Sequence, residues 1–368
     1  MKLLFAVLIL FAPQITFSQQ CNCQLNFDYV VNHVKNNYAG FNDKIKKGNR
    51  KDFEKLTSFL SVNSLAANTV DSCYVLLRTW TNYFKDNHLR VQLDWRYRKK
   101  YPEVAKRLTL QFAKPVLRPP AADKPESKTS FKVLDDKTIL LRLPSFEWGE
   151  KKNIDSLFTT YSAELKNAHN WIIDLRGNDG GTDYAFSAIM PYIYTNPIIT
   201  KPDEYLSSEE NIEVLTENLK DDELSKAGRD FLTTLIDLMK KNPNQFVNPS
   251  GKDNFEVKFD SVYRYPNKIG ILIDRNTASS AESFLLSAIQ SKRVIVYGEN
   301  SAGTLDYSNT QYFNIPCKDF NLVIPIARSK RLPAHPIDNI GIKPDVKINV
   351  EEKNKINFVL KAMEQDKK

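Results

Sequence analysis

The chain has 368 residues, of which 42% are hydrophobic and 26% are charged. This length and apolar content support one large domain or two ordinary domains with a sizeable core, and they exclude a disordered chain. The formal net charge of +8 is modest for the length. Lysines are mixed with acidic residues, and no basic motif is interleaved with aromatic residues, so nucleic acid is not an expected partner.

The N-terminus has the layout of a signal peptide. A lysine precedes an apolar run over residues 3–12, Pro13 closes the run, and small residues favour cleavage after Ser18. A membrane anchor is the alternative, but the run is roughly half of the ~20 residues that a spanning helix needs. A lipid anchor on Cys21 is a weaker alternative, because a leucine and small residues do not precede it. We therefore expect residues 1–18 to be removed and the mature protein to be periplasmic or secreted, without stable membrane insertion.

The mature chain keeps four cysteines: Cys21, Cys23, Cys73 and Cys317. Export permits disulfides, and four cysteines allow three pairings. Because Cys21 and Cys23 are too close in sequence to pair comfortably, we expect the N-terminal tail to be bonded to Cys73 or Cys317. No second close Cys or Cys/His pair accompanies the first, which disfavours a zinc site. Neither a metal nor an organic cofactor is expected.

The first part of the mature chain has helical periodicity. Apolar residues recur at helical spacing over residues 26–38, and a second helical stretch covers 71–84. We therefore expect a helical N-terminal region over residues 19–95. The next segment, 96–136, is rich in Lys, Arg and Pro and is predicted to be a linker or a loosely built arm.

From residue 137 the pattern changes to strands that alternate with helices, which is typical of a βαβ fold. We expect an α/β core over residues 137–350. A charged, helix-forming insertion at 201–265 interrupts the core and is a candidate lid. Residues 351–368 are expected to form a C-terminal helix or tail. The predicted strands of the core are 138–143, 171–175, 269–273 and 294–297, and its predicted helices are 154–165 and 279–290.

Two segments at the ends of predicted strands carry candidate chemistry. In Thr-Ala-Ser-Ser-Ala-Glu, residues 277–282, Ser279 lies where a strand ends and a helix begins, so its hydroxyl lies at the positive end of the helix dipole. The same residues fit a capping box, and a structural helix cap is therefore the alternative role for Ser279. In Asp-Leu-Arg-Gly-Asn-Asp-Gly-Gly, residues 174–181, a buried strand runs into a glycine-rich loop whose amides can turn outward. This loop lacks the P-loop and dinucleotide-binding motifs.

In chain order, with the glycine-rich loop first and the serine segment second, the two segments resemble the catalytic core shared by the tail-specific (C-terminal processing) proteases and the tricorn core protease. The family motifs Asp-x-Arg-x-Asn-x-Gly-Gly and Thr-Ala-Ser-x-x-Glu match residues 174–181 and 277–282. The resemblance covers residues 71–346 and implies a crotonase-like spiral core of ββα units, here with an N-terminal helical cap. Nothing between residues 94 and 137 resembles the Gly-rich PDZ domain that many relatives carry.

The resemblance also implies roles for individual residues. Ser279 is the implied nucleophile. The implied oxyanion hole consists of the amide of Gly180 or Gly181 together with the amide of Ser280. Two convergent N–H donors stabilise a tetrahedral oxyanion, and the loss of one donor typically raises the barrier by roughly 3 kcal/mol.

The serine also needs a base. One branch of the family uses a lysine in a Gly-x-x-x-x-Gly-Lys segment, but Thr304 stands at that place here. The tricorn-like branch uses a histidine before the core and a carboxylate near its end, an arrangement equivalent to a Ser-His-acid triad. His88, in a segment similar to the family's Asp-Gly-His-Thr element, is the predicted base. Asp338, in a segment similar to the family's Glu-x-x-Gly-Val-x-Pro-Asp ending, is the predicted acid. His335 is the alternative base, and a surface turn is the alternative role for Asp338.

The sequence thus predicts an exported serine endopeptidase that acts on a peptide or protein substrate. His88 deprotonates Ser279, and a covalent acyl-enzyme follows. The first alternative is a catalytically inactive binding or scaffold protein on the same fold, as in the retinoid-binding relatives of this family. The second alternative is a crotonase-type enzyme that acts on acyl thioesters, whose coenzyme is not available to an exported protein. Reaction of Ser279 with a serine-directed phosphonate separates the peptidase from the scaffold.

Overall fold

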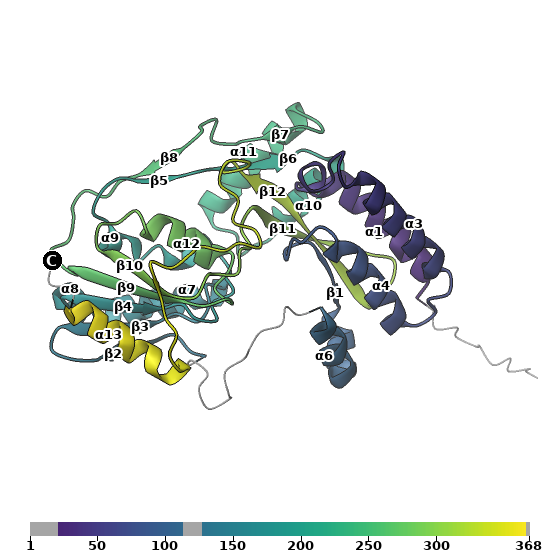
Figure 1. Cartoon of the computed structure of the whole chain (residues 1–368). Coiled ribbons are helices and arrows are strands. Elements are labelled where there is room, and N and C mark those ends of the chain that lie inside the picture. Colours follow the sequence, from purple (N-terminus) through teal and green to yellow (C-terminus); the bar gives the residue numbers. More distant parts are fainter. Residues whose placement is uncertain (1–20, 113–126, 366–368) are drawn as a thin grey trace, which may run out of the picture.

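The computed structural model describes residues 21–112 and 127–365 (Figure 1). The expected signal peptide at 1–18 and part of the expected linker lie outside these ranges. Two main sheets organise the described chain, one made of six strands and one made of five.

The six-stranded sheet has the strand order β13-β10-β9-β4-β3-β2. Neighbouring strands are parallel, except that β2 is antiparallel to β3. Parallel strands that are covered on both faces consist of near-continuous apolar runs, which is why the sequence of the three central strands predicts them well. The strands are β2 (Ser130–Val133), β3 (Thr138–Arg142), β4 (Asn170–Asp174), β9 (Lys268–Ile273), β10 (Val294–Gly298) and β13 (Val346–Lys347).

Helices cover both faces of this sheet (Figure 1). On one face, α7 (Trp148–Thr160) and α12 (Ser280–Ala288) pack through side chains such as Phe158 and Phe284 against Trp171 of β4. On the other face, α13 (Lys355–Gln365) packs through Val359 against Ile172. The predicted α/β fold class is confirmed. Because β4 and β9 are parallel neighbours, the loops that follow them lie side by side at one edge of the sheet.

The five-stranded sheet has the order β1-β12-β6-β7, and β11 also pairs with β12. Its strands are antiparallel and come from three distant parts of the chain. None of them was predicted from the sequence. In β1, β6 and β11, charged and polar residues obscure the alternation, whereas β12 has a buried apolar run over residues 322–327 that the prediction missed. The strands are β1 (Arg90–Leu93), β6 (Asp203–Leu206), β7 (Phe246–Val247), β11 (Tyr307–Asn314) and β12 (Phe320–Ser329).

The N-terminal helices pack on this second sheet. Phe27 and Trp80 from the helices share one hydrophobic cluster with Phe320 and Leu322 of β12. The N-terminal region is therefore built onto strands from the C-terminal half of the chain, and it carries residues 84–90 toward the main sheet. Its helices are α1 (Cys23–Asn37), α2 (Phe41–Lys44), α3 (Arg50–Ser64) and α4 (Val70–Asn82).

The segment expected to be a linker over residues 96–136 is partly regular structure. It contains α5 (Trp95–Lys100), α6 (Pro102–Gln111) and β2, and residues 113–126 lie outside the described ranges. The Asp94 carboxylate accepts a hydrogen bond from the Arg96 N–H at the start of α5, and Pro102 opens α6. The expectation of a loosely built arm is corrected here, because the Lys and Arg side chains lie on the outer faces of short helices.

The expected insertion at 201–265 is part of the folded body. It supplies β6 and β7 to the second sheet, and two helices pack beside them through Leu215 and Leu235. These helices are α10 (Glu209–Asn218) and α11 (Lys226–Lys241), and β8 (Phe255–Val257) pairs with β5 (Ile198–Thr200). The remaining short elements are α8 (Ser162–Asn167), η2 (Asp183–Phe186), α9 (Met190–Ile193) and η3 (Glu352–Asn354).

Two disulfides fix the N-terminal end of the described chain. Cys21 is bonded to Cys317, and Cys23 is bonded to Cys73. Both cysteines of the tail therefore pair with the distant residues that the sequence named, and not with each other. Among the described residues, no helix is long and apolar enough to cross a membrane.

Candidate active site

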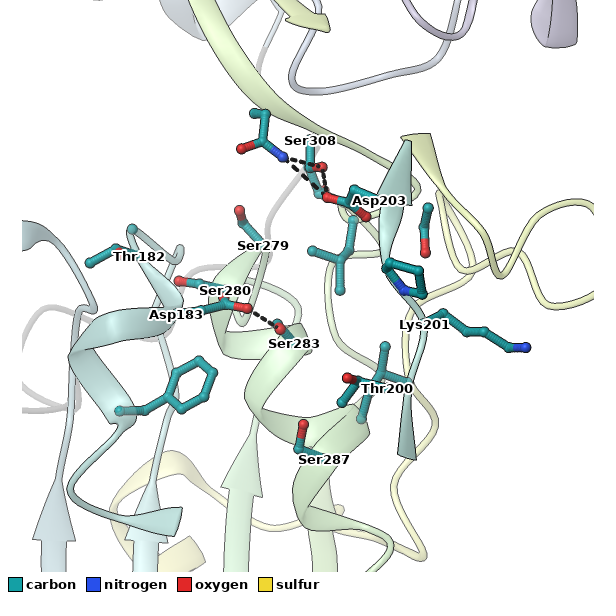
Figure 2. Close-up of a pocket in the computed structure, with 18 of the residues that line it drawn as sticks. Thr182, Asp183, Thr200, Lys201, Asp203, Ser279, Ser280, Ser283, Ser287 and Ser308 are labelled. Carbon is teal, nitrogen blue, oxygen red and sulfur yellow. Dashed lines mark hydrogen bonds between the residues drawn. The ribbon is translucent and has the colours of Figure 1, made fainter. Parts of the chain in front are cut away.

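Ser279 lies in a sharp turn between β9 and α12, and its side chain faces a cleft (Figure 2). Its backbone has φ 55° and ψ −123°, a combination that is rare for a residue with a side chain. The turn is held against the glycine-rich loop. The Ala278 N–H donates to the Asn178 carbonyl at 2.9 Å, and the Thr277 hydroxyl donates to the Leu175 carbonyl at 3.0 Å. The two segments that the sequence singled out thus meet at the ends of β4 and β9.

The carboxylate of Glu282 fixes this turn from inside the protein. It is buried and accepts hydrogen bonds from the N–H of Ser279 at 3.1 Å and from the hydroxyl of Ser301 at 2.6 Å. The N–H groups of Gly303 and Thr304 donate to it at 2.7 and 2.8 Å. These four hydrogen bonds offset the free-energy cost of removing the charged carboxylate from water. Glu282 therefore takes its place in the capping box and also ties the nucleophile to a second loop.

His88 reaches Ser279 from the N-terminal region. Its Nε2 lies 3.3 Å from the Ser279 Oγ, and its Nδ1 lies 2.6 Å from the carbonyl oxygen of Tyr307. A carbonyl oxygen only accepts hydrogen bonds, so Nδ1 carries the proton of the neutral ring. The lone pair of Nε2 then faces the serine hydroxyl, which is the tautomer that a general base requires. The two residues are separated by 191 positions in the sequence.

Asp86 positions the loop that carries His88. One of its carboxylate oxygens accepts the His88 N–H at 2.8 Å, and the other accepts the Tyr38 hydroxyl at 2.7 Å. The side chain of Asn87 donates to the Thr304 hydroxyl at 3.0 Å, which links this loop to the one held by Glu282. Asp86 was not among the residues predicted from the sequence to belong to the site. An Asp two residues before the His is the pattern of an Asx turn, and that signal points to it.

Asp338 does not contact His88. Its Oδ1 accepts the N–H groups of Leu305 and Asp306 at 3.1 and 2.9 Å, and its Oδ2 lies 3.4 Å from the Lys44 Nζ. The expectation that Asp338 orients the His88 ring directly is therefore corrected. The backbone carbonyl of Tyr307 takes the position at Nδ1 that a carboxylate holds in a Ser-His-acid triad.

The side chain of Asp338 is nevertheless buried, which excludes the surface-turn alternative. Burial raises the pKa of its carboxyl to about 7, and the nearby charges of Asp86 and Asp306 add to this rise. The alternative base, His335, lies exposed on the wall of the same cleft. In the part of the chain that the structure describes, no hydrogen bond joins His335 to Ser279, so His88 is the residue brought to the nucleophile.

Of the two glycine N–H groups in the loop, one already donates a hydrogen bond within the described protein and the other does not. The Gly180 N–H donates to the Asn178 side chain at 3.0 Å, whereas the N–H groups of Gly181 and Ser280 have no acceptor within residues 21–112 and 127–365. Gly181 has φ +139°, and a Cβ there would overlap the backbone of Phe146. Of the two glycines that the sequence left open, Gly181 therefore has the amide that is available, together with Ser280, to an oxyanion.

The sequence profile of peptidase family S41 matches residues 137–348, which is more than half of the chain. The chain belongs to peptidase family S41. Members of this family are serine proteases, so the chain is a serine-type peptidase, and a peptide or protein is its expected substrate. The resemblance drawn from residues 174–181 and 277–282 is confirmed at the level of the family.

Solved structures agree with the S41 fold over nearly the whole chain. A putative peptidase from Parabacteroides merdae is 16% identical with a TM-score of 0.57, over 93% of this chain and 96% of its own. Mature CPAF complexed with lactacystin is 11% identical with a TM-score of 0.59, over 94% and 98%. A lipoprotein from Streptococcus agalactiae is 14% identical with a TM-score of 0.50, over 98% and 99%. At these identities the likeness shows the fold alone. No curated protein matches the chain.

In this S41 chain, Ser279 and His88 open onto a cleft of about 2200 Å³ between the main sheet, the 201–265 segment and β11. Several carboxylates also line it, among them Asp183 and Asp203 (Figure 2). The described residues contain no group of three or more His, Cys, Asp or Glu side chains arranged to hold a metal ion. The cleft thus presents a serine, a histidine and free backbone amides to a substrate.

Proposed function

We propose that the chain is an exported serine endopeptidase that hydrolyses peptide bonds through an acyl-enzyme on Ser279. The observation that carries the proposal is the His88 ring, with Nδ1 held by a carbonyl oxygen and Nε2 at 3.3 Å from the Ser279 Oγ. This ring can accept the serine proton without first changing its tautomer. Thr304, which stands where one branch of the family has a lysine, donates its N–H to Glu282 and has no base to offer.

The reaction follows from this placement. His88 Nε2 takes the proton of Ser279 as the oxygen attacks the scissile carbonyl, and the developing oxyanion accepts hydrogen bonds from the amides of Gly181 and Ser280. The imidazolium then donates its proton to the leaving amine, and an acyl-enzyme remains. Water, deprotonated by the same nitrogen, hydrolyses the ester and restores the serine.

Export is supported by the N-terminal sequence and by the disulfides. Residues 1–18 have the charge, apolar run and cleavage site of a signal peptide. Both disulfides use cysteines within five residues of the expected new N-terminus, and disulfides persist in oxidising compartments. Expression of the full chain in a bacterial host, followed by fractionation and mass measurement, should yield a periplasmic or secreted product that begins at Gln19. A full-length cytoplasmic product contradicts this part of the proposal.

Labelling with a fluorophosphonate probe tests the catalytic part. The wild-type protein should be labelled at Ser279, and Ser279→Ala and His88→Ala should abolish the labelling. Ser287→Ala and His335→Ala are matched controls in the same cleft and should leave it unchanged. Loss of labelling in His335→Ala but not in His88→Ala overturns the assignment of the base. If the wild-type protein is folded but unlabelled, the inactive binding or scaffold protein is favoured. The backbone carbonyl that replaces a carboxylate at His88 Nδ1 is the structural feature that supports this alternative.

A further inference from the structure

The carboxylate of Asp183 lies on the wall of the cleft beside the nucleophile. Asp183 begins η2, two residues after the free amide of Gly181, and the Thr182 hydroxyl caps this short helix by accepting the Tyr184 N–H at 3.2 Å. The hydroxyl of Ser283 donates to Asp183 Oδ2 at 2.6 Å. Figure 2 shows this pair at the first turn of α12, directly beyond Ser279. The carboxylate is thus fixed in place by the same helix that carries the nucleophile.

The charge of this carboxylate is not neutralised by a cation of the described residues. Within these residues, Asp183 has no ion-pair partner, and its hydrogen-bond donor is the neutral hydroxyl of Ser283. Four cations line the cleft: Arg90, Lys201, Arg275 and Arg331. Arg331 pairs with Asp306, Arg275 pairs with Glu299, and Arg90 donates to backbone carbonyls of its own loop. None of the four forms an ion pair with Asp183 in the described chain, so this carboxylate presents its charge to the cleft next to the reaction centre.

A second carboxylate, Asp203, adds to the negative charge near Asp183. Its hydrogen-bond donors are neutral, since the Ser308 hydroxyl donates to it at 2.6 Å and the Asn309 side chain at 3.1 Å, although the charge of Arg331 also acts on it. Asp183 is open to the cleft, but the protein atoms packed around its carboxyl reduce its hydration and raise its pKa to about 6, and the charge of Asp203 contributes to that rise. Asp183 is therefore mainly ionised at neutral pH and gains from a cationic ligand.

An independent feature of the same wall also points to a ligand. The side chain of Ser280 is 4% exposed, and its Oγ has no hydrogen-bond partner in the described chain. Buried hydroxyl groups are nearly always hydrogen-bonded in folded proteins. Ser280 lines the cleft, and Figure 2 draws it beside Asp183. Its hydroxyl can accept a hydrogen bond from a donor that a substrate brings.

The distances along α12 match the length of a basic side chain. Ser283 is four residues after Ser279, which corresponds to about 6 Å along a helix. A lysine ammonium on its four-carbon stem reaches about the same distance from its Cα. Phe186 and Leu286 line the same cleft and offer apolar surface to such a stem.

We propose that Asp183, Ser280 and Ser283 form the pocket for the side chain of the residue whose carbonyl Ser279 attacks, and that this pocket selects lysine or arginine. The inference deepens the proposed function and rests on it for the identity of the attacked residue. Asp183 provides the charge, Ser283 holds the carboxylate in place, and the hydroxyl of Ser280 accepts a further hydrogen bond from the cationic group.

Binding to an inactivated protein tests the pocket without any turnover. The probes are acetyl-Ala-Ala-Lys-Ala-Ala-amide and the same peptide with norleucine, which has a similar length and no charge, in place of lysine. The Ser279→Ala protein should bind the lysine peptide on the order of 10-fold more tightly. Adding Asp183→Asn should reduce this ratio to about 1. Adding Asp230→Asn should preserve it, because Asp230 lines the far wall and is already paired with Lys226. Equal binding of the two peptides overturns the inference.

Turnover by the active protein separates failure of the pocket from failure of the proposed function. Fluorogenic peptides with lysine, arginine, norleucine or glutamate at the attacked residue should give the highest kcat/KM for the two basic residues, and Asp183→Lys should shift the preference to glutamate. If the wild type is labelled by fluorophosphonate and cleaves the norleucine substrate equally well, the pocket assignment is wrong and the peptidase stands. If nothing is labelled or cleaved but Ser279→Ala still prefers the lysine peptide, the pocket stands and the peptidase assignment is wrong.

Discussion

The Nδ1 of His88 lies 2.6 Å from the carbonyl oxygen of Tyr307, the first residue of β11. A backbone carbonyl thus sets the tautomer of the histidine, and the chain needs no carboxylate at this position to aim Nε2 at Ser279. The orientation of His88 therefore depends on the packing of the N-terminal region against the second sheet, because His88 and Tyr307 belong to different segments of the chain. The contacts at this interface and around Ser279 lead to four predictions.

The first concerns Asp86, which positions the His88 loop through the His88 N–H and the Tyr38 hydroxyl. Asp86→Ala should lower kcat/KM on the order of 100-fold, since a base displaced by about 1 Å loses that much. The loss should appear in kcat and in the rate of fluorophosphonate labelling, with little change in KM. Asp86→Asn keeps an acceptor for the His88 N–H and should recover most of the activity. Equal loss in both variants, with unchanged folding, contradicts the positioning role.

The second prediction concerns Glu282 and its four hydrogen-bond donors. Glu282→Gln replaces one acceptor oxygen by an NH₂ group that faces N–H donors, so we expect a loss of about 3 kcal/mol in the free energy of unfolding. Urea denaturation followed by circular dichroism measures it. Glu217→Gln is the matched control, because Glu217 is exposed and paired with Lys220 at the surface. A Glu282→Gln protein as stable as the control shows that the carboxylate does not hold the turn.

The third prediction is a pH dependence caused by Asp338. The pKa of its carboxyl is raised from its ordinary value of 3.8 to about 7 in the folded protein, mainly by burial. The folded state therefore binds this proton more tightly, so the contribution of Asp338 to stability is complete below pH 3.8 and is lost as pH rises through 7. Asp338→Asn keeps an acceptor for the Leu305 and Asp306 amides and does not ionise. Between about pH 5 and pH 8, the variant should gain on the order of 2 kcal/mol in unfolding free energy relative to the wild type.

Chemical denaturation of both proteins at several pH values measures this difference. Asp253→Asn is the control, because Asp253 is exposed and bonded to Lys330 at the surface. Parallel pH profiles for wild type and Asp338→Asn mean that the Asp338 carboxyl is ionised normally in the folded protein.

The fourth prediction concerns the disulfide between Cys23 and Cys73, which closes a loop with a sequence separation of 50 residues. A bond that closes a loop of this size lowers the conformational entropy of the unfolded chain, which stabilises the folded protein by about 4 kcal/mol in the loop-entropy description. The double variant Cys23→Ser/Cys73→Ser should therefore unfold at a clearly lower temperature, and reduction of the wild type, which also breaks the bond between Cys21 and Cys317, should lower it at least as much. A melting temperature that neither change affects would show that the bond adds nothing to stability.

The sequence by itself determined the α/β core and the place of Ser279 at the end of one of its strands. The central strands β3, β4 and β9 are apolar runs because a parallel strand is covered on both faces, and this pattern is local. Ser279 and the glycine loop follow directly from such strands, so their meeting at one sheet edge could be predicted from the order of the elements. The glycines of the loop are a second signal that the sequence shows, although their cause is tertiary: the backbones of residues 278–280 and 146–147 leave no room for a Cβ at Gly180 and Gly181.

Only the tertiary structure decided the partners of these residues. The carbonyl of Tyr307, the place of Asp338 away from the histidine, and the use of the Gly180 amide by Asn178 all depend on contacts between segments far apart in the sequence. The same holds for the second sheet, whose strands come from three distant segments and are covered partly by the N-terminal helices and partly by α10 and α11. Backbone donors and acceptors have no sequence signature, so which amide is free and which carbonyl orients a histidine are settled only when the chain is folded.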